Sequence, residues 1–376
     1  MRLTIPQPQF LKSLQAVEHA VNDRSTLPIL GNVLVETKEQ ELCLTATDLD
    51  VGIQCRFPLV PPVEPGAVAL PARKLTTIIR ELASETVTLE SKKNHTATVN
   101  CGNSSFRIPG LPAEDFPVLP TVDSEARVLV PQAGLKQLVT LTAYAMSMEE
   151  TRFILNGALL TVQKSELVMV ATDGRRLAMA MTPLAEPGKH PMQVVVPSKT
   201  VRELGRLLTN DEGEDVVVAP LKGTSQRGAG EADQAMFRFG PITMLTRVIE
   251  GQFPQYEKVI PPAVKTGMTC DRAGLMNAIR RASLMTTATS QAVVFELSEG
   301  KLVISKESPE LGSAREELPV RYVGEPTAIA FNPEFWLDVL KVLPVDEVVI
   351  EIAGPDRPAV IRQPRFLYLV LPMKLT

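Results

Sequence analysis

Short runs of alternating apolar and polar residues recur along the chain, and turn residues or longer amphipathic stretches separate them. Residues 41–48 read Glu-Leu-Cys-Leu-Thr-Ala-Thr-Asp, and residues 166–173 repeat the pattern 125 positions later as Glu-Leu-Val-Met-Val-Ala-Thr-Asp. A weaker copy, Lys-Leu-Val-Ile-Ser, follows at 301–305. Runs of this kind, bounded by turn residues, predict β-strands, and their return at a similar interval predicts an internal repeat.

Two turns can be predicted from the residues that interrupt these runs. The run 167–172, the pair Asp173-Gly174 and the run 175–181 predict a hairpin with a two-residue type I′ turn, since Asp-Gly supplies the positive φ angles that this turn needs. The Gly-rich polar stretch 221–230 is typical of a longer hairpin loop, which makes the middle repeat the longest.

The amphipathic stretches predict two helices in each repeat. Pro6, Pro131 and Pro197 stand just before three of them, where the missing N–H of proline costs least. The predicted helices cover residues 7–22, 72–82, 132–147, 198–208, 271–285 and 333–343. Two helices beside a mainly antiparallel sheet in each repeat predict an α+β fold.

Further markers keep the same order in each repeat. Those that precede the second helix lie at 70–74, 196–199 and 330–333, and those that open each repeat lie at 3–6, 128–131 and 268–271. Two Phe-Pro segments close the first and second repeats, at 115–120 and 252–256. The chain is therefore predicted to form three related domains at about 1–126, 127–262 and 263–376.

Composition excludes several classes of protein. The 376 residues are 44% hydrophobic and 22% charged, which is ordinary for a globular chain and excludes collagen, a coiled coil or whole-chain disorder. Four scattered cysteines, without a CxxC pair, indicate small buried hydrophobes rather than a disulfide framework or a zinc site. No apolar run is long enough to span a bilayer and the start has no signal-peptide pattern, so we expect a cytoplasmic protein without a membrane partner.

Chemistry-bearing motifs are scarce. The three histidines lie far apart, and no nucleotide-binding, nucleophile-elbow or zinc-protease motif occurs. The stretch 48–52, Asp-Leu-Asp-Val-Gly, lacks the remaining ligands of a calcium loop and indicates a tight acidic turn. We expect no catalytic residue, no metal and no cofactor. An enzyme with an unrecognised carboxylate site around Asp48, Asp50 and Asp173 stays open as an alternative.

The net charge of −4 would by itself argue against a nucleic-acid partner. The charge is segregated, however: the six predicted helices carry a net +6, which leaves −10 for the strands and loops. Two explanations remain open at this point. Lys and Arg are good helix formers on solvated faces, or the helices face phosphate while the sheets keep an acidic exterior.

The chain resembles the bacterial sliding clamps, the β subunits of DNA polymerase III, over its whole length. The stretches that carry the resemblance are 24–32 (Arg-Ser-Thr-Leu-Pro-Ile-Leu-Gly-Asn), 45–49, 155–157, 171–178 (Ala-Thr-Asp-Gly-Arg-Arg-Leu-Ala), 253–256 and the terminal 368–375. The resemblance implies three clamp domains, each with two helices packed on antiparallel sheets. It also implies that one chain forms half of a closed ring.

The resemblance further implies a non-catalytic processivity factor: a head-to-tail homodimer that encircles double-stranded DNA without reading its sequence. The implied protein partners are the polymerase catalytic subunit, the clamp loader and other proteins with a clamp-binding motif. A clamp paralogue that serves repair or inhibitor resistance remains the alternative.

The residues expected to face DNA combine one match to the family with four helix positions. Arg24 matches a family contact, while placement on the predicted helices suggests Arg73, Lys199, Arg202 and Arg206. Met148 and Glu149 stand where the family has polar contacts, which argues against duplex contact at that loop.

The resemblance also implies a dimer interface and a peptide cleft between the second and third domains. The implied interface residues are Lys74, Ile78, Leu82, Phe106, Ile108, Leu284 and Met285. The implied cleft residues are Leu155, Thr172, Gly174, Arg175, Arg176, Leu177, Pro254, Val259, Asn332, Phe335, Pro358, Val370, Leu371, Pro372 and Met373. An apolar groove rimmed by arginine suits a peptide with leucine or aromatic anchors. Arg175 and Lys258 depart from the family's usual His and Arg.

Overall fold

A computed structural model describes residues 1–38, 40–83, 85–119, 126–186, 192–211, 213–221 and 232–374. The chain forms two compact units. Unit 1 contains Met1–Gln132, Ala185–Val194 and Arg206–Val248, and unit 2 contains Ala133–Leu184, Val195–Gly205 and Ile249–Thr376. The predicted hairpin loop at 221–230 lies outside the described residues beyond Leu221.

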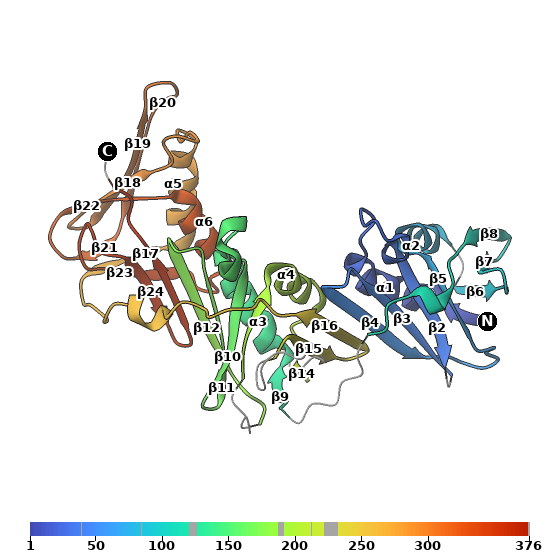
Figure 1. The fold of residues 1–376 in the computed structure, drawn as a ribbon. Coiled ribbons are helices and arrows are strands. Elements are labelled where there is room, and N and C mark those ends of the chain that lie inside the picture. The colour runs from blue at the N-terminus through green and yellow to red at the C-terminus, as the bar shows by residue number, and fades with distance from the viewer. Residues whose placement is uncertain are drawn as a thin grey trace. The chain divides into compact units, whose positions relative to one another are not determined.

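In the described residues, six α-helices form where amphipathic stretches were predicted (Figure 1). They are α1 (Gln7–Val17), α2 (Ala72–Glu81), α3 (Gln132–Thr142), α4 (Ser198–Leu207), α5 (Arg272–Ser283) and α6 (Pro333–Val342). The predicted ends of α1 and α3 were too long, because the last turn tightens into the 3₁₀ helices η1 (Glu18–Ala20) and η4 (Ala143–Ala145). Asn332 caps α6 by accepting a hydrogen bond from the Glu334 N–H at 2.9 Å.

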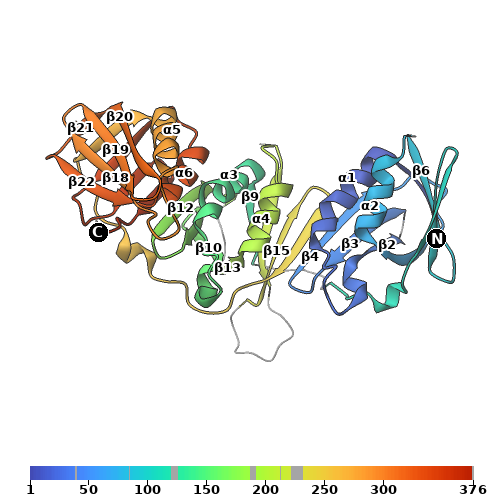
Figure 2. The same ribbon diagram turned by 90° about the horizontal axis from the view of Figure 1, so that it is seen from above.

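Unit 1 is built on two sheets. In spatial order, the smaller sheet has β1 (Arg2–Pro6), β6 (Thr86–Ser91), β7 (Thr96–Cys101) and β8 (Ser104–Pro109). The larger sheet has β5 (Gly66–Pro71), β2 (Asn32–Lys38), β3 (Glu41–Thr47), β4 (Val51–Pro58), β16 (Ile242–Arg247), β15 (Gln234–Phe239), β14 (Asp215–Leu221) and β9 (Val128–Pro131). Helices α1 and α2 lie side by side, and α1 packs on β3 and β4 (Figure 2).

Unit 2 also holds two sheets. The larger has β13 (Gln193–Pro197), β10 (Gly157–Gln163), β11 (Glu166–Thr172), β12 (Arg176–Pro183), β25 (Phe366–Val370), β24 (Ala359–Gln363), β23 (Glu347–Ile352), β17 (Gly267–Asp271) and β21 (Arg321–Val323). The smaller has β20 (Gly312–Pro319), β19 (Lys301–Ser308), β18 (Val293–Ser298) and β22 (Thr327–Phe331).

Each large sheet joins strands that belong to different repeats. In unit 1, β4 of the first repeat pairs antiparallel with β16 of the second, and we call this place the first junction. In unit 2, β12 of the second repeat pairs antiparallel with β25 of the third, which we call the second junction. Each junction includes the turn that leads into its first strand. The two junctions are therefore equivalent positions in the repeat.

All four cysteines are buried and make no disulfide, as the sequence predicted. Burial raises the pKa of Cys43 and Cys55, and it raises the pKa of Cys270 to about 12. These thiols are therefore protonated and poorly reactive at neutral pH. None of the helices within the described ranges is long and apolar enough to cross a membrane.

Candidate functional site

The hairpin turn that begins the second junction is held by two side chains. The Thr172 hydroxyl accepts a hydrogen bond from the Gly174 N–H at 3.0 Å and donates one to the Arg176 carbonyl at 2.6 Å. The Asp173 carboxylate accepts from the N–H groups of Arg175 and Arg176, at 2.9 and 3.0 Å. The predicted hairpin is confirmed by the pairing of β11 with β12.

The predicted type I′ turn was wrong. A type I′ turn needs positive φ at both central residues, whereas within this described turn only Gly174 has one, at 86°. The Thr and Asp side chains supply the hydrogen bonds that fix the turn, so its shape depends on an Asx-type arrangement rather than on two left-handed residues.

The end of the chain is hydrogen-bonded to this turn and to the third repeat. The Leu371 N–H donates to the Arg175 carbonyl at 2.9 Å, and the Met373 N–H donates to the Ala330 carbonyl near the end of β22 at 2.7 Å. Asn332, which caps α6, follows Ala330 by two residues. The hairpin turn, the chain end and the start of α6 therefore come together in unit 2.

This region combines exposed apolar side chains with a buried apolar floor. Leu371 is 40% exposed and Met373 is 38% exposed. Val259 is 56% exposed and ends η6 (Tyr256–Val259), whose Tyr256 belongs to the same hydrophobic cluster as Leu177. Leu155 and Leu177 are buried in one hydrophobic cluster. Apolar side chains gathered near the surface in this way are typical of an interaction site.

The structure places every residue of the predicted cleft in unit 2, but at different depths. Leu155, Thr172, Arg176, Leu177, Asn332 and Val370 are buried, Phe335, Pro358 and Pro372 are half-buried, and Gly174, Arg175, Pro254, Val259, Leu371 and Met373 are exposed. Val370 pairs with Arg176 and Leu369 pairs with Leu177, so Val370 lies on the opposite face of the sheet from the cluster.

Leu369 is therefore the strand residue that shares the cluster with Leu177, and the predicted set lacked it. The alternation of side chains along a strand was the signal that could have found it. Successive side chains of a strand point to opposite faces of the sheet. A choice that is wrong by one position therefore selects a residue on the opposite face from the hydrophobic cluster.

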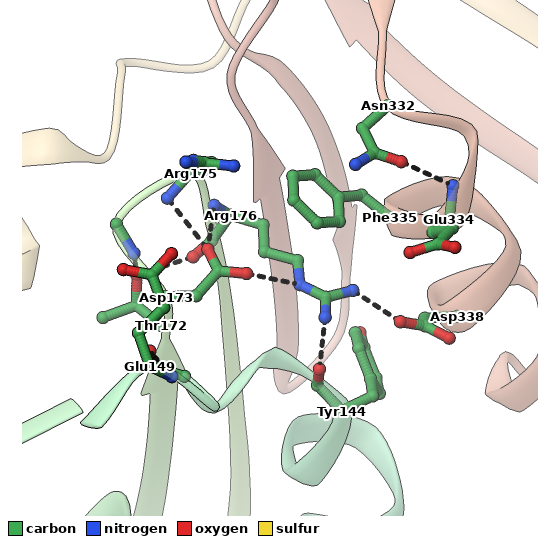
Figure 3. A network of polar contacts seen from close by, with 12 residues as sticks. Tyr144, Glu149, Thr172, Asp173, Arg175, Arg176, Asn332, Glu334, Phe335 and Asp338 are labelled. Carbon is green, nitrogen blue, oxygen red and sulfur yellow. Dashed lines mark hydrogen bonds and ion pairs between the residues drawn. The ribbon is translucent and has the colours of Figure 1, made fainter. Parts of the chain in front are cut away.

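Arg176 lies at the centre of a polar network on that opposite face (Figure 3). Its Nε donates to Asp173 Oδ2 at 3.0 Å, its Nη1 donates to Asp338 Oδ2 at 2.6 Å and its Nη2 donates to the Tyr144 carbonyl at 2.5 Å. The guanidinium carbon also lies 4.5 Å from the centre of the Phe335 ring, within cation–π range. One side chain thus joins β12, the end of α3 and α6.

The Arg176 charge is well compensated although the residue is only 8% exposed. Burial alone would lower the pKa of Arg176, but the hydrogen bond to Asp338 and the charge of Asp173 outweigh it and raise the pKa. Because each terminal nitrogen already has a partner, we interpret Arg176 as a residue that positions the turn and α6.

Asp338 and Tyr144 are members of this network that the sequence analysis missed. Asp338 follows Phe335 by three residues, which puts both on one face of α6. That spacing was the only available signal, because no local pattern relates α6 to a hairpin turn so distant in the chain.

Arg152 supports the same turn from η5 (Glu150–Leu155). Its Nη1 donates to the Asp173 carbonyl at 2.6 Å, and its Nε pairs with Glu149 at 3.2 Å. A methyl group added to Gly174 would lie 2.6 Å from Arg152 Nη1. Glycine at 174 therefore serves both the positive φ and the close approach of Arg152.

The predicted DNA-facing residues in unit 1 differ in their surroundings. Arg24 and Arg73 are exposed, and Arg73 forms an ion pair with Asp23 at 2.6 Å. Arg206 donates to the carbonyls of Gln15 and Ala16 at the end of α1, both at 3.1 Å. Part of the Arg206 charge is therefore used to stabilise the end of a helix.

In unit 2, Lys199 is half-buried and Arg202 is exposed, both on α4. The Arg202 Nη2 lies 2.8 Å from the sulfur of Met148, which is itself exposed. Lys199, Arg202 and Arg206 are three and four residues apart, so they share one face of α4.

The predicted interface residues lie near two sheet edges. In the described part of the chain, β8 and β20 each have a strand neighbour on one side only. In unit 1, Phe106 and Lys74 are exposed, while Ile78, Leu82 and Ile108 are buried. In unit 2, Leu284 after α5 is exposed and Met285 is half-buried.

Two of the three aspartates of the enzymatic alternative, Asp48 and Asp173, have structural roles. The Asp48 carboxylate accepts from the N–H groups of Asp50 and Val51 at 3.1 and 2.8 Å, as Asp173 does in its own turn. Among the residues that the structure describes, no group of three or more His, Cys, Asp or Glu side chains could hold a metal ion. The tight acidic turn predicted at 48–52 is confirmed.

Comparison with known proteins gives consistent matches over the whole chain. Residues 1–120, 129–255 and 257–374 match the N-terminal, central and C-terminal domains of the DNA polymerase III beta subunit. The beta sliding clamp of Pseudomonas putida is 34% identical over 380 residues, with full coverage of both chains. The three clamp domains and the α+β fold are thereby confirmed, while the domain bounds set from the repeats remain a prediction.

Solved structures agree with this comparison. A crystal structure of the sliding clamp of Pseudomonas aeruginosa bound to griselimycin has a TM-score of 0.92 and 33% identity, and each chain is fully covered. A sliding clamp structure from Bacillus subtilis has a TM-score of 0.91 and 29% identity, again over both whole chains.

Proposed function

The chain belongs to the family of DNA polymerase III beta subunits, the bacterial beta sliding clamps, and from that premise we propose that two copies close head to tail around duplex DNA. The ring would hold the replicative polymerase on its template and carry out no chemistry itself. The protein would act in the cytoplasm, where replication takes place in bacteria. The observation that supports partner binding is the exposed apolar surface at the second junction.

The two sheet edges support ring closure. An edge strand presents unpaired N–H and C=O groups and readily pairs with another chain. Edge β8 in one copy would meet edge β20 in the other, with Phe106 and Leu284 supplying apolar contact. Because the two edges differ, the contact is heterologous, and it closes into a ring when two copies complete the circle.

The distribution of charge supports a DNA-facing helix layer. Arg24, Arg73, Lys199 and Arg202 are the side chains for which we propose phosphate contacts, with Arg206 shared between phosphate and the end of α1. Such contacts are insensitive to sequence and weaken with salt, which suits a ring that must slide.

The second junction is the proposed binding site for partner peptides. Leu371 and Met373 offer apolar contact near a turn that Thr172 and Asp173 hold in one shape, and we expect Val259 to add to this surface. A clamp of this family binds griselimycin, and we propose that this chain binds griselimycin and the short motifs of the polymerase, the clamp loader and other partners here. A preformed site loses little entropy on binding.

Three measurements test the proposal together. Sedimentation should give a dimer, and a clamp loader should place the protein on nicked circular DNA, from which it is released when the circle is cut. Met373→Ala should weaken binding of a partner peptide while the ring stays on circles. A monomer that is not retained on circular DNA would contradict the proposed function.

A further inference from the structure

The first junction has the same turn as the second. The Thr47 hydroxyl accepts a hydrogen bond from the Leu49 N–H and donates one to the Val51 carbonyl, both at 3.0 Å. The Asp48 carboxylate accepts from the N–H groups of Asp50 and Val51. Leu49 has a φ of 80°, so a leucine occupies the left-handed position that glycine takes in the second junction. Two separate regions thus have one turn architecture.

The strand pairing that follows the turn is also equivalent. Gly52 pairs with Leu245 where Leu177 pairs with a leucine in the second junction. The Arg247 N–H donates to the Asp50 carbonyl at 2.9 Å, the same distance as the corresponding bond between the chain end and the second turn. The scaffold proposed to bind peptides in unit 2 is therefore present in unit 1 as well.

The two junctions differ in what covers the strand after the turn. A methyl group added to Gly52 would lie 2.6 Å from Leu119 Cδ2 and 3.1 Å from its Cδ1. Leu119 also packs against the buried cluster of Ala219, Met236 and Leu245. A leucine from the segment that follows β8 therefore fills the place that a strand leucine fills in the second junction.

In the second junction the corresponding residue makes different contacts. Counting from the two Phe-Pro pairs, Tyr256 stands where Leu119 stands in the first repeat. The Tyr256 hydroxyl accepts a hydrogen bond from Gln163 Nε2 at 3.0 Å. Gln163 ends β10, at the opposite end of the β10–β11 hairpin from Thr172. Tyr256 is buried in the cluster that contains Leu177, and its hydroxyl is hydrogen-bonded at the far end of the hairpin. At the strand position after the turn, the second junction therefore has its own leucine, Leu177, where the first has Gly52 covered by Leu119.

We propose that Leu119 acts as an internal ligand that closes the first junction to partner peptides. Removing its side chain would open a second site for the same class of ligand, an apolar peptide with leucine or aromatic anchors. This inference rests on the proposed peptide site at the second junction. It explains why a chain with two equivalent scaffolds would bind one partner peptide.

The test compares the full-length wild type with Leu119→Ala and with Val118→Ala. Val118 is 93% exposed, so its truncation is a matched change in the same segment. Isothermal titration with a synthetic peptide that contains leucine and phenylalanine should give one site per chain for the wild type and for Val118→Ala. Leu119→Ala should give two sites per chain, the second weaker than the first.

A second pair of variants locates the new site and guards against misfolding. In Leu119→Ala combined with Met373→Ala, the remaining peptide should bind at the first junction. Gly52→Leu combined with Leu119→Ala places a leucine where the second junction has Leu177, and should tighten the second site by about tenfold. All variants must show the dimer mass and melting cooperativity of the wild type.

One peptide per chain in both folded Leu119 variants would overturn the inference. No peptide bound to the wild type would instead contradict the proposed function of the second junction. The two failures are distinguishable, because the first leaves the wild-type site intact.

Discussion

The two junctions share a scaffold and differ in how each side of it is covered. On the face of the sheet that carries the hydrophobic cluster, Leu119 covers Gly52 in the first junction. The second junction has Leu177 at the position of Gly52, and the exposed Leu371 and Met373 lie near its turn. On the other side, the turn of the first junction ends in the buried Val51, while the second presents a charged residue at that place.

An arginine stabilises a helix end in both units, but it comes from different elements. In unit 1, Arg206 of α4 donates to the carbonyls of Gln15 and Ala16 at the end of α1. In unit 2, Arg176 of the hairpin donates to the Tyr144 carbonyl after α3 and also binds Asp338 on α6. A few side chains around an unchanged turn thus decide whether a repeat is closed or open to partners.

Arg176→Leu should have the largest effect on stability. The substitution leaves Asp173 and Asp338 without their cation, and we expect the free energy of unfolding to fall by about 2–4 kcal/mol. We expect a value toward the lower end of this interval, because the Asp338 side chain is partly exposed. Urea unfolding measures the change. Arg175→Ala is the matched control and should cost less than about 0.5 kcal/mol. Equal effects of the two substitutions would contradict the assigned role of Arg176.

Gly52→Leu should destabilise the first junction by about 1–3 kcal/mol, because the new side chain collides with Leu119. Leu119→Ala should relieve part of this cost, with a coupling of about 1–2 kcal/mol in a double-mutant cycle of unfolding free energies. Strict additivity of the two changes would show that Leu119 does not occupy the place of a strand leucine.

Met373→Ala should weaken the binding of griselimycin by about tenfold and leave the free energy of unfolding within about 0.5 kcal/mol of the wild type. The reason is that Met373 is exposed and contributes contact area without filling the core. Val349 on β23 is also an exposed apolar residue, so Val349→Ala is the control and should bind griselimycin unchanged. Equal loss in both variants would contradict the placement of the site.

Tyr256→Phe should have the smallest effect, a loss of about 0.5–1.5 kcal/mol from the missing hydrogen bond with Gln163. Burial raises the pKa of Tyr256 above its ordinary value of 10.0, so the folded state favours the protonated phenol. This contribution is complete below pH 10 and is lost as pH rises through the folded-state pKa. The difference in unfolding free energy between the wild type and Tyr256→Phe should therefore shrink as the pH rises from 8 to 11.5. A difference that stays constant with pH would contradict this prediction.

Much of the fold could be predicted from local patterns. The six helices and the β11–β12 hairpin follow from amphipathic and alternating periodicity, and the repeat order indicated the three domains. The turn type could not be predicted from the Asp-Gly pair, because Thr172 and Asp173 hold the loop through side-chain hydrogen bonds. The turn preferences of a dipeptide do not account for side-chain hydrogen bonds to the backbone, which here favour a different turn.

The site could be predicted in outline but not in its contacts. Leu371 and Met373 were expected to line the cleft, and they are exposed apolar residues. Arg176 was expected to line it too, but it is buried and paired with two aspartates. Its partners come from segments far apart in the chain, which no spacing rule connects. The covering of Gly52 by Leu119 is equally non-local.

A crystal structure of the wild-type chain with griselimycin tests the central claim most directly. We expect ligand against Leu371 and Met373 at the second junction, with Leu119 still packed on Gly52 and no ligand at the first junction. Ligand bound at the first junction, or Leu119 displaced from Gly52, would contradict it.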